Sequence, residues 1–469
     1  MPHSMHHHDD QVSDLTFYRT AYDAMRAEPE KLAYVALLKP DGMAVVDVDP
    51  LSEEYGTVVG EWRAEHGEQD EFHHFGWNVC SSILGGQHAH HHAAERRYLV
   101  VPGIRSSRIY ILDVGGDPRN PKLHKVIEPS EVMALSGYSR PHTVHCGPEG
   151  LYVSALGAGT PDGDGGPAGI FNLDHDSFEV LGRWEEDHGS QFYAYDFWWH
   201  IDANVLMASE WAPPRLVENG LDVDALVKRQ YGHKLHFFDL ATRRQVQELD
   251  LGDQYQMALE VRPAHDPSAT YGFLGVVVDV TSLASSIWMW YQENHRWEIR
   301  KVIEIPAVAA NLEDVPEIVK PFGGQVPPLL SDIVLSLDDH YLYAALWGIG
   351  EIHQYDVSDP LHPFLASRIE LGGMARHTPF VDGRPFAGGP QMLELSRDGK
   401  RLYGTNSLYS SWDDQFYPQG IPGFMFKADI TDHGMTLDRR FAVEFSGTRA
   451  HQIRLQGGDC STDSYCFRE

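Results

Sequence analysis

Hydrophobic and polar positions alternate along most of this chain in short runs, and one arrangement of these runs recurs. An alternating segment usually ends in Asp, a polar turn follows, and a second alternating segment completes the unit. Alternation with a period of two is typical of a half-buried β-strand, so each unit predicts a β-hairpin. The seven units occupy residues 43–62, 108–128, 169–185, 234–251, 287–306, 351–371 and 425–445.

A further alternating strand precedes most of the hairpins. These strands are predicted at 97–104, 150–156, 204–211, 271–278, 340–348 and 401–409. From Asp47 to Asp429, the residue that ends the first hairpin strand recurs about every 60 residues, which indicates a repeat architecture. Units of three or four strands that repeat in this way are typical of propeller blades. We therefore expect an all-β fold, a seven-bladed β-propeller with short helical decorations.

The repeats also bear on the number of domains. They predict a single propeller domain over residues 17–469, preceded by a disordered or leader-like tail over residues 1–16. Two β-sandwich domains side by side are the alternative architecture. The propeller is favoured because no linker rich in Pro, Gly and Ser divides the chain.

Helical patterns are few and short. We predict helices at 19–30, at 128–136 with Ser130 placed to cap, and at 221–229. The Gly- and Asp-rich segment 157–169 predicts a surface turn or loop. Each predicted helix is short enough to decorate a connection between blades.

The charge of the chain excludes two classes of partner. The 68 acidic and 37 basic residues give a formal net charge of −31, which repels nucleic-acid phosphates and anionic lipid surfaces. No segment approaches the roughly 18 consecutive apolar residues of a membrane helix. The first ten residues are His-rich and acidic, whereas a signal peptide is basic and then apolar. We therefore expect a cytoplasmic protein with no nucleic-acid or membrane partner; a homo-oligomer is compatible with the sequence.

The four cysteines are Cys80, Cys146, Cys460 and Cys466. They are too few and too scattered for a disulfide framework, so reduced thiols are predicted. None of them forms a C-x-x-C pair, which argues against a structural zinc site of the cysteine-rich kind.

The chain contains 27 histidines, and imidazole is a common ligand of copper, iron, zinc and nickel. Many of them are explained as exposed surface residues that form no specific metal site. Such positions are predicted for the run at residues 6–8, which is native or belongs to a leader, and for His88, His90, His91 and His92.

Three other segments place histidine among aromatic and small residues in connections between blades. The first holds His73 and His74, which would point to opposite faces of a regular strand and could share an ion only if the backbone bends. The second holds His142 and His145, whose spacing suits one side of a turn, and the preceding Arg140-Pro141 favours a turn over a strand.

The third segment holds His451 near the C-terminus, where closure of the ring would bring it beside the N-terminal pair of histidines. Several neutral imidazoles without thiolate suit copper or non-haem iron, with positions left open for dioxygen or substrate. Copper is the predicted cofactor and iron is the alternative.

Longer strings of the sequence resemble a known family. They include DEFHHFGWNVCSS (70–82), SSRIYILDVGGDPRNPKLHKVIEP (106–129), AGGPQMLELSRDGKRLYGTNSLYSSWDDQFYP (387–418) and RAHQIRLQGGDCSTD (449–463). These strings look like the selenium-binding protein / methanethiol oxidase family, and the resemblance extends from about residue 17 to about residue 465.

The resemblance implies a seven-bladed propeller and, for the bacterial members, a copper enzyme. The implied reaction converts methanethiol, O₂ and water to formaldehyde, hydrogen sulfide and hydrogen peroxide. The metal motifs of the family carry over as five histidines: His73, His74, His142, His145 and His451.

The chain also departs from the family pattern. The cysteine to which selenium binding is attributed in animal members falls at Gly56, which argues against a selenium-carrying role through that thiol. Ile83 stands where relatives often have a second cysteine, and the Cys-Gly-rich opening of the family is replaced by LTFYRTAYDAM (15–25).

Other residues are candidates for contact with the metal ligands. Cys80 and Cys146 lie close to the histidine motifs in sequence and could be a ligand, a redox partner or core packing. Glu210 and Asp332 could orient a ligand imidazole, although a salt bridge or a turn cap is the more ordinary role.

The resemblance therefore implies a copper-dependent oxidase of a small thiol, with O₂ as the second substrate. Two alternatives remain. One is a non-catalytic copper or selenium carrier or scaffold, and the other is a non-haem iron oxygenase.

Overall fold

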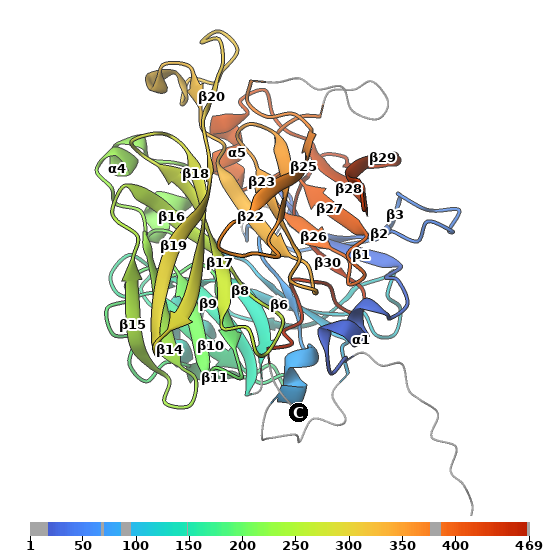
Figure 1. Cartoon of the computed structure of the whole chain (residues 1–469). Helices are drawn as coiled ribbons and strands as arrows, with labels where there is room; N and C mark the ends of the chain where they lie inside the picture. Colours follow the sequence, from blue (N-terminus) through green and yellow to red (C-terminus); the bar gives the residue numbers. More distant parts are fainter. Residues whose placement is uncertain (1–16, 67–69, 86–94, 148, 376–385, 467–469) are drawn as a thin grey trace, which may run out of the picture.

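The computed structural model describes residues 17–66, 70–85, 95–147, 149–375 and 386–466. The predicted tail 1–16, with its histidine run, and the loop histidines His88, His90, His91 and His92 lie outside the described residues. Figure 1 shows sheets arranged around a central axis, with the first and the last strands of the chain side by side. The chain is a seven-bladed β-propeller, as the repeats predicted.

Each blade is a four-stranded antiparallel sheet. Its first strand lies at the central channel and its fourth strand at the outer edge. The first blade comprises β30 (Arg449–Leu455), β1 (Leu32–Leu38), β2 (Gly42–Asp47) and β3 (Val58–Arg63). The second comprises β4 (Gly76–Trp77), β5 (Tyr98–Pro102), β6 (Ile109–Asp113) and β7 (Lys122–Ile127). The third comprises β8 (Tyr138–Gly147), β9 (Gly150–Ala158), β10 (Gly169–Leu173) and β11 (Val180–Arg183). The fourth comprises β12 (Phe197–His200), β13 (Val205–Ser209), β14 (Lys234–Asp239) and β15 (Arg244–Asp250).

The remaining three blades follow the same plan. The fifth comprises β16 (Tyr255–Pro263), β17 (Tyr271–Asp279), β18 (Ser285–Glu293) and β19 (Arg296–Ile305). The sixth comprises β22 (Leu330–Leu335), β23 (Tyr341–Leu346), β24 (Glu351–Asp356) and β25 (Phe364–Glu370). The seventh comprises β26 (Leu393–Leu395), β27 (Arg401–Thr405), β28 (Gly423–Thr431) and β29 (Gly434–Phe445).

The first strands of the blades form the inner wall of the ring, because they contact the first strands of neighbouring blades. The ring is closed by β30, a C-terminal strand that pairs antiparallel with β1 at the start of the chain. This exchange ties the two ends of the propeller together and leaves no unpaired inner edge there. Strand β8 is buried along its whole length, whereas β25 at the outer edge of its blade is mostly exposed.

Within the described residues, one helix precedes the first strand and the others lie in connections between strands. They are α1 (Ala21–Met25), α2 (Pro129–Ser136), α3 (Pro214–Val217), α4 (Val223–Val227), α5 (Ser410–Phe416) and the short 3₁₀ segments η1 (Ser81–Gly85) and η2 (Lys320–Phe322). All three predicted helices exist, although the first and the third are shorter than predicted. The prediction that Ser130 caps the second helix is wrong: Glu128 is the N-cap residue, and Pro129 begins the helix because its fixed φ suits the first turn. Within the described residues, no helix combines the length and the apolar character needed to cross a lipid bilayer.

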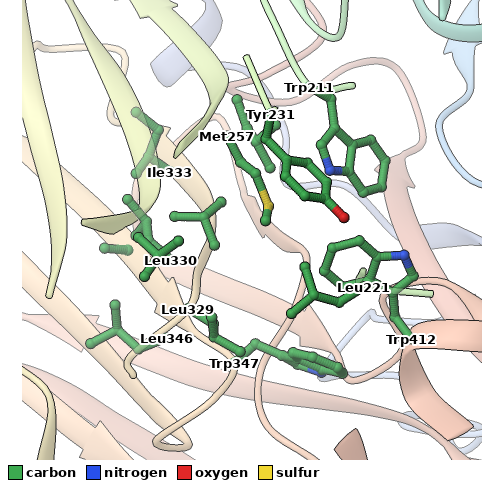
Figure 2. Close-up of a cluster of buried hydrophobic side chains, with 14 of the residues drawn as sticks. Trp211, Leu221, Tyr231, Met257, Leu329, Leu330, Ile333, Leu346, Trp347 and Trp412 are labelled. Atoms are coloured by element: carbon green, nitrogen blue, oxygen red, sulfur yellow. The ribbon is translucent and has the colours of Figure 1, made fainter. Parts of the chain in front are cut away.

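One end of the ring is covered by insertions. Figure 1 shows α4, α5 and the small sheet of β20 (Val308–Ala309) and β21 (Gln325–Val326) toward the top of the view, and α1 toward the bottom. The covering elements are connected: Trp412 Nε1 donates to Val217 O at 2.8 Å, and Leu221 N donates to Gln415 Oε1 at 2.8 Å. Beneath them lies the largest hydrophobic cluster, in which Trp211, Trp347 and Trp412 pack near Leu330 (Figure 2).

Candidate metal centre

His73 and His74 lie in the connection that leads into β4. Glu71 has a φ of +58°, and β4 begins only at Gly76, so the two histidines precede the regular strand and the backbone bends as the shared-ion interpretation required. The two rings stack with centroids 5.0 Å apart. Gly76 allows this connection to lie against β8, because a Cβ there would be 2.5 Å from Val144 O.

His142 comes from β8. The predicted turn at this position is wrong, because residues 138–147 form a continuous strand. The strand is irregular instead: its register shifts between Pro141 and Val144, and Arg140 has a φ of +59°. A bulge of this kind re-aims side chains. His142 Nε2 lies 2.9 Å from His73 Nδ1, and the ring centroids of His142 and His74 are 4.1 Å apart.

His451 lies on β30, the strand that closes the ring. Closure brings it to the N-terminal pair, as expected: the ring centroids of His451 and His73 are 3.5 Å apart. Its Nδ1 donates to Ser407 O at 2.6 Å, which leaves Nε2 as the nitrogen with a free lone pair. Residues almost 380 positions apart in the chain thus meet because the propeller closes.

Four imidazoles therefore converge in the channel. One nitrogen from each of His73, His74 and His142 lies within 4.8 Å of the others, and His451 packs against His73 beside this group. Among the described residues, the Nε2 atoms of His73, His74 and His451 have no hydrogen-bond partner, and the Nε2 atom of His145, further along β8, has none either. Buried polar atoms without partners are rare, so those of His73, His74 and His451 point to a ligand.

The four imidazoles are held neutral. Burial lowers the pKa of His142 and of His451 to about 3. Burial, followed by the nearby imidazoles, also lowers the pKa of His73 and of His74 well below the usual value. A neutral imidazole keeps the lone pair that a metal ion needs.

Thr143 orients two of the rings. Its Oγ1 lies 3.2 Å from Nδ1 of His74 and 3.0 Å from Nδ1 of His142. These contacts occupy the Nδ1 side of each ring and leave Nε2 to face the centre of the group. The cluster therefore has the donor set of a copper or non-haem iron site, with three or four imidazoles and no thiolate.

His145, the fifth predicted ligand, lies apart from the group. It is buried on the same strand, and its ring packs on Trp198 with centroids 4.0 Å apart. Its Nε2 is 3.9 Å from Asp196 Oδ1, and burial lowers the pKa of His145 to about 4. The structure therefore brings together four of the five predicted histidines. The fifth, His145, lies outside this group, beside the carboxylate of Asp196.

Cys80 and Cys146 are buried in the hydrophobic cluster that includes residues of the second and third blades. Cys80 Sγ lies 3.0 Å from Cys146 O and 2.6 Å from Ser82 Oγ. Burial raises the pKa of Cys146 well above its usual value, which keeps it a thiol. All four cysteines are free, as predicted.

Glu210 and Asp332, the two predicted carboxylates, have different surroundings. Glu210 accepts a hydrogen bond from His236 Nε2 at 2.9 Å. Asp332 lies on β22, where it accepts from Leu393 N at 2.7 Å and from Arg262 Nη2 at 3.3 Å. Burial raises the pKa of Asp332 to about 7.

The sequence pattern did not reveal the polar residues that contact the imidazoles. Tyr195 packs against His142 with ring centroids 4.4 Å apart, and its OH donates to Glu260 Oε1 at 2.9 Å. Glu260 Oε1 in turn lies 4.0 Å from His74 Nε2. Burial raises the pKa of Tyr195 and of Glu260 well above the usual values.

Arg262 joins these groups into a network. It contacts Glu260 at 2.9 Å, Asp196 at 2.8 Å and Asp332 at 3.3 Å. A sequence signal for it existed: Glu260 and Arg262 are charged residues two apart on an otherwise apolar strand, as Asp332 is on its own strand. A charged residue on a strand buried on both faces indicates a functional or paired position.

Comparison with known proteins identifies relatives of the whole chain. The family described as 56kDa selenium binding protein (SBP56) matches residues 11–466. A methanethiol oxidase from Xenopus tropicalis is 37% identical over 481 residues, which covers 95% of this chain and 97% of the relative. Selenium-binding protein 2 from Mus musculus is 38% identical with the same coverage.

A solved structure is more similar still. The crystal structure of a hypothetical selenium-binding protein from Sulfolobus tokodaii is 50% identical, with a TM-score of 0.92. The alignment covers 97% of this chain and 100% of that chain, so the two proteins share the fold over their full length.

Proposed function

Because the chain belongs to the 56 kDa selenium-binding protein family, we propose that it is a copper-dependent methanethiol oxidase. The proposed reaction converts methanethiol, O₂ and water to formaldehyde, hydrogen sulfide and hydrogen peroxide. The observation that carries the proposal is the convergence of four buried imidazoles, three of which, those of His73, His74 and His451, have an Nε2 atom without a hydrogen-bond partner among the described residues. It is supported by similarity, over 95% of the chain, to proteins named methanethiol oxidase.

His73, His74 and His142 would hold the ion, and His451 would complete the set. Burial holds these side chains neutral, and one nitrogen from each of His73, His74 and His142 lies within 4.8 Å of the others, which fits a copper ion bound by imidazoles alone. A bound copper ion would supply the redox centre that electron transfer from the thiol to O₂ requires.

The other residues would position the substrate and handle protons. Glu260 lies next to His74 and shares a hydrogen bond with Tyr195, so its carboxylate is placed to hold the proton that the thiol releases. Arg262 fixes the carboxylate in place through its contact at 2.9 Å. An apolar cavity beside His73 would receive the alkyl part of the substrate.

Gly56 argues against the alternative of selenium transport through a surface thiol. This residue occupies a turn with a φ of +73°, a backbone conformation that favours glycine over cysteine. A copper carrier would keep the imidazole cluster, so catalytic turnover is the property that separates a carrier from an oxidase. The cytoplasmic location predicted from the sequence belongs to the proposal as well.

The test is metal analysis of the purified protein, combined with assays of sulfide and peroxide release from methanethiol under air and under argon. We expect close to one copper per chain and sulfide release only in the presence of O₂. Copper without turnover would overturn the oxidase and favour a carrier. Iron in place of copper, with an oxygenated product, would overturn the copper assignment.

A further inference from the structure

A small apolar cavity adjoins the imidazole cluster. Its lining includes His73, Trp211, Met257, Val277, Leu330 and Trp347. Figure 2 shows Met257, Leu330, Trp347 and Trp211 around this part of the channel. The cavity volume, taken as the space open to the centre of a water molecule, is about 20 Å³. One water molecule needs roughly 10–15 Å³ on this measure, so the cavity suits a group of very few heavy atoms.

The cavity touches the proposed metal site directly. His73 belongs both to the cavity wall and to the imidazole group, and its ring centroid is 6.4 Å from that of Trp211. Two polar atoms in the lining, Trp211 Nε1 and Gln391 Oε1, have no hydrogen-bond partner among the described residues. A few polar atoms in an otherwise apolar lining match a molecule with one polar head and a short hydrocarbon part.

We propose that this cavity binds the alkyl group of the thiol and that Leu330 limits the length of that group. The inference rests on the proposed methanethiol oxidase function and adds the residue that sets the preference for methanethiol over longer alkanethiols, Leu330. The size of the cavity is its physical basis, since an apolar pocket discriminates by roughly tenfold or more for each methylene that it cannot accommodate.

Leu330 is well fixed for this role. It is the first residue of β22, it is buried, and its backbone N–H donates to Ser285 Oγ at 3.1 Å. Gly275 lies behind it, where an added Cβ would be 3.1 Å from Leu330 Cδ2. Leu330 therefore cannot retreat when a longer substrate enters, and a side chain at position 275 would press it further into the cavity.

Three variants test the inference. Leu330→Ala removes three carbons from the wall and should raise kcat/KM for n-propanethiol relative to methanethiol by about tenfold or more. Gly275→Ala narrows the cavity. It should lower the kcat/KM for ethanethiol relative to the kcat/KM for methanethiol. Leu335→Ala is the matched control, because Leu335 is buried on the same strand but does not line the cavity; its ratios should stay within about twofold of wild type.

A second measurement does not depend on copper or on turnover. An apolar cavity of this size should bind xenon in crystals under gas pressure, with higher occupancy in Leu330→Ala. Absence of xenon from the cavity in both proteins would overturn the inference, as would an unchanged chain-length preference in a folded, active Leu330→Ala variant. No oxidation of any thiol by the copper-loaded wild type, with xenon bound, would instead overturn the proposed function on which the inference rests.

Discussion

The outer hairpins and the innermost strands of the blades are built from different sequences. The outermost strand β7 exposes the side chains of its first residues, and every residue of β15 is exposed or half-buried. By contrast, β8, β22 and β30 are buried at every position. An outer strand has one face toward the protein and one face toward solvent, whereas an inner strand is buried on both faces.

The chemistry lies on the inner strands. His142, His451, Arg262 and Asp332 are on first strands of blades, and His73 and His74 directly precede one. The channel brings together first strands from all seven blades, so it is the place where residues far apart in sequence meet. The outer hairpins provide the scaffold, and substitutions in the two regions should therefore differ in kind as well as in size.

The largest difference is expected for copper binding. His451→Ala should lower the copper content by at least tenfold, because it removes a buried imidazole that contacts His73. The measurement is metal analysis after dialysis against a weak chelator, together with circular dichroism to confirm folding.

The matched control is His124→Ala. His124 lies exposed on β7, the outermost strand of the blade that His73 leads into, and its loss should leave the copper content unchanged. His145→Ala sharpens the result further: because His145 lies against Trp198 outside the imidazole group, we expect copper to be retained. Loss of copper from His145→Ala, or its retention by His451→Ala, would mean that the ion sits elsewhere in the channel.

The next largest effect is expected for the buried charge network. Arg262→Met leaves Glu260, Asp196 and Asp332 without their shared cation, and breaking a buried ion pair costs about 3–5 kcal/mol. We expect the free energy of unfolding, measured with urea, to fall by that amount.

Arg368→Met on β25 is the comparison at the outer edge. Arg368 is 57% exposed and lies 3.8 Å from Glu370, so its removal should change the free energy of unfolding by less than about 1 kcal/mol. Equal effects of the two variants would show that Asp332 and Glu260 become protonated when Arg262 is lost, which their raised pKa values would allow.

The same contrast explains what could be predicted from the sequence. All seven hairpins were predicted, because alternation records a strand with one solvated face. The first strands of the blades were not predicted. β4 has two residues, β26 has three, and β8 is buried on both faces, so hydrophobic and polar residues do not alternate along them. Arg140-Pro141 predicts a turn before His142, whereas the structure accommodates this pair in a strand with a bulge.

Residue types could suggest the histidines of the site, but only closure of the ring could show which of them meet. His145 has the same sequence signal as His142 and a different location, because the bulge at Pro141–Val144 decides which side chain faces the group. Glu260 carried a signal as a charged residue on a buried strand, but its contact with His74, and that of Tyr195 with His142, could not be predicted because these contacts depend on three-dimensional packing.

A pH effect of intermediate size is expected at the other end of the channel wall. His265 follows β16 and is buried, and burial lowers its pKa to about 4. A lowered folded-state pKa means that the unfolded chain binds the proton more tightly, so stability is fully present above pH 6.5 and is lost as the pH falls toward 4. At pH 5 this histidine alone accounts for about 2 kcal/mol.

His265→Gln should therefore reduce the difference in unfolding free energy between pH 8 and pH 5 by about 2 kcal/mol. Urea titrations at the two pH values measure it. If the variant keeps the full pH dependence, then His265 is protonated in the folded protein and pairs with a carboxylate such as Asp339, whose oxygens accept from the backbone beside it.

The smallest effect is expected at the outer edge of the sixth blade. Phe364 begins β25 and is 60% exposed, so Phe364→Lys removes little buried area and should change the free energy of unfolding by less than about 0.5 kcal/mol. Copper content and turnover should equal those of the wild type, because the strand lies three strands away from the channel. A larger loss of stability, with a concentration-dependent midpoint, would show that a second copy of the chain covers this edge. Sedimentation of wild type and variant would then reveal a homo-oligomer that the outer strands, and not the channel, hold together.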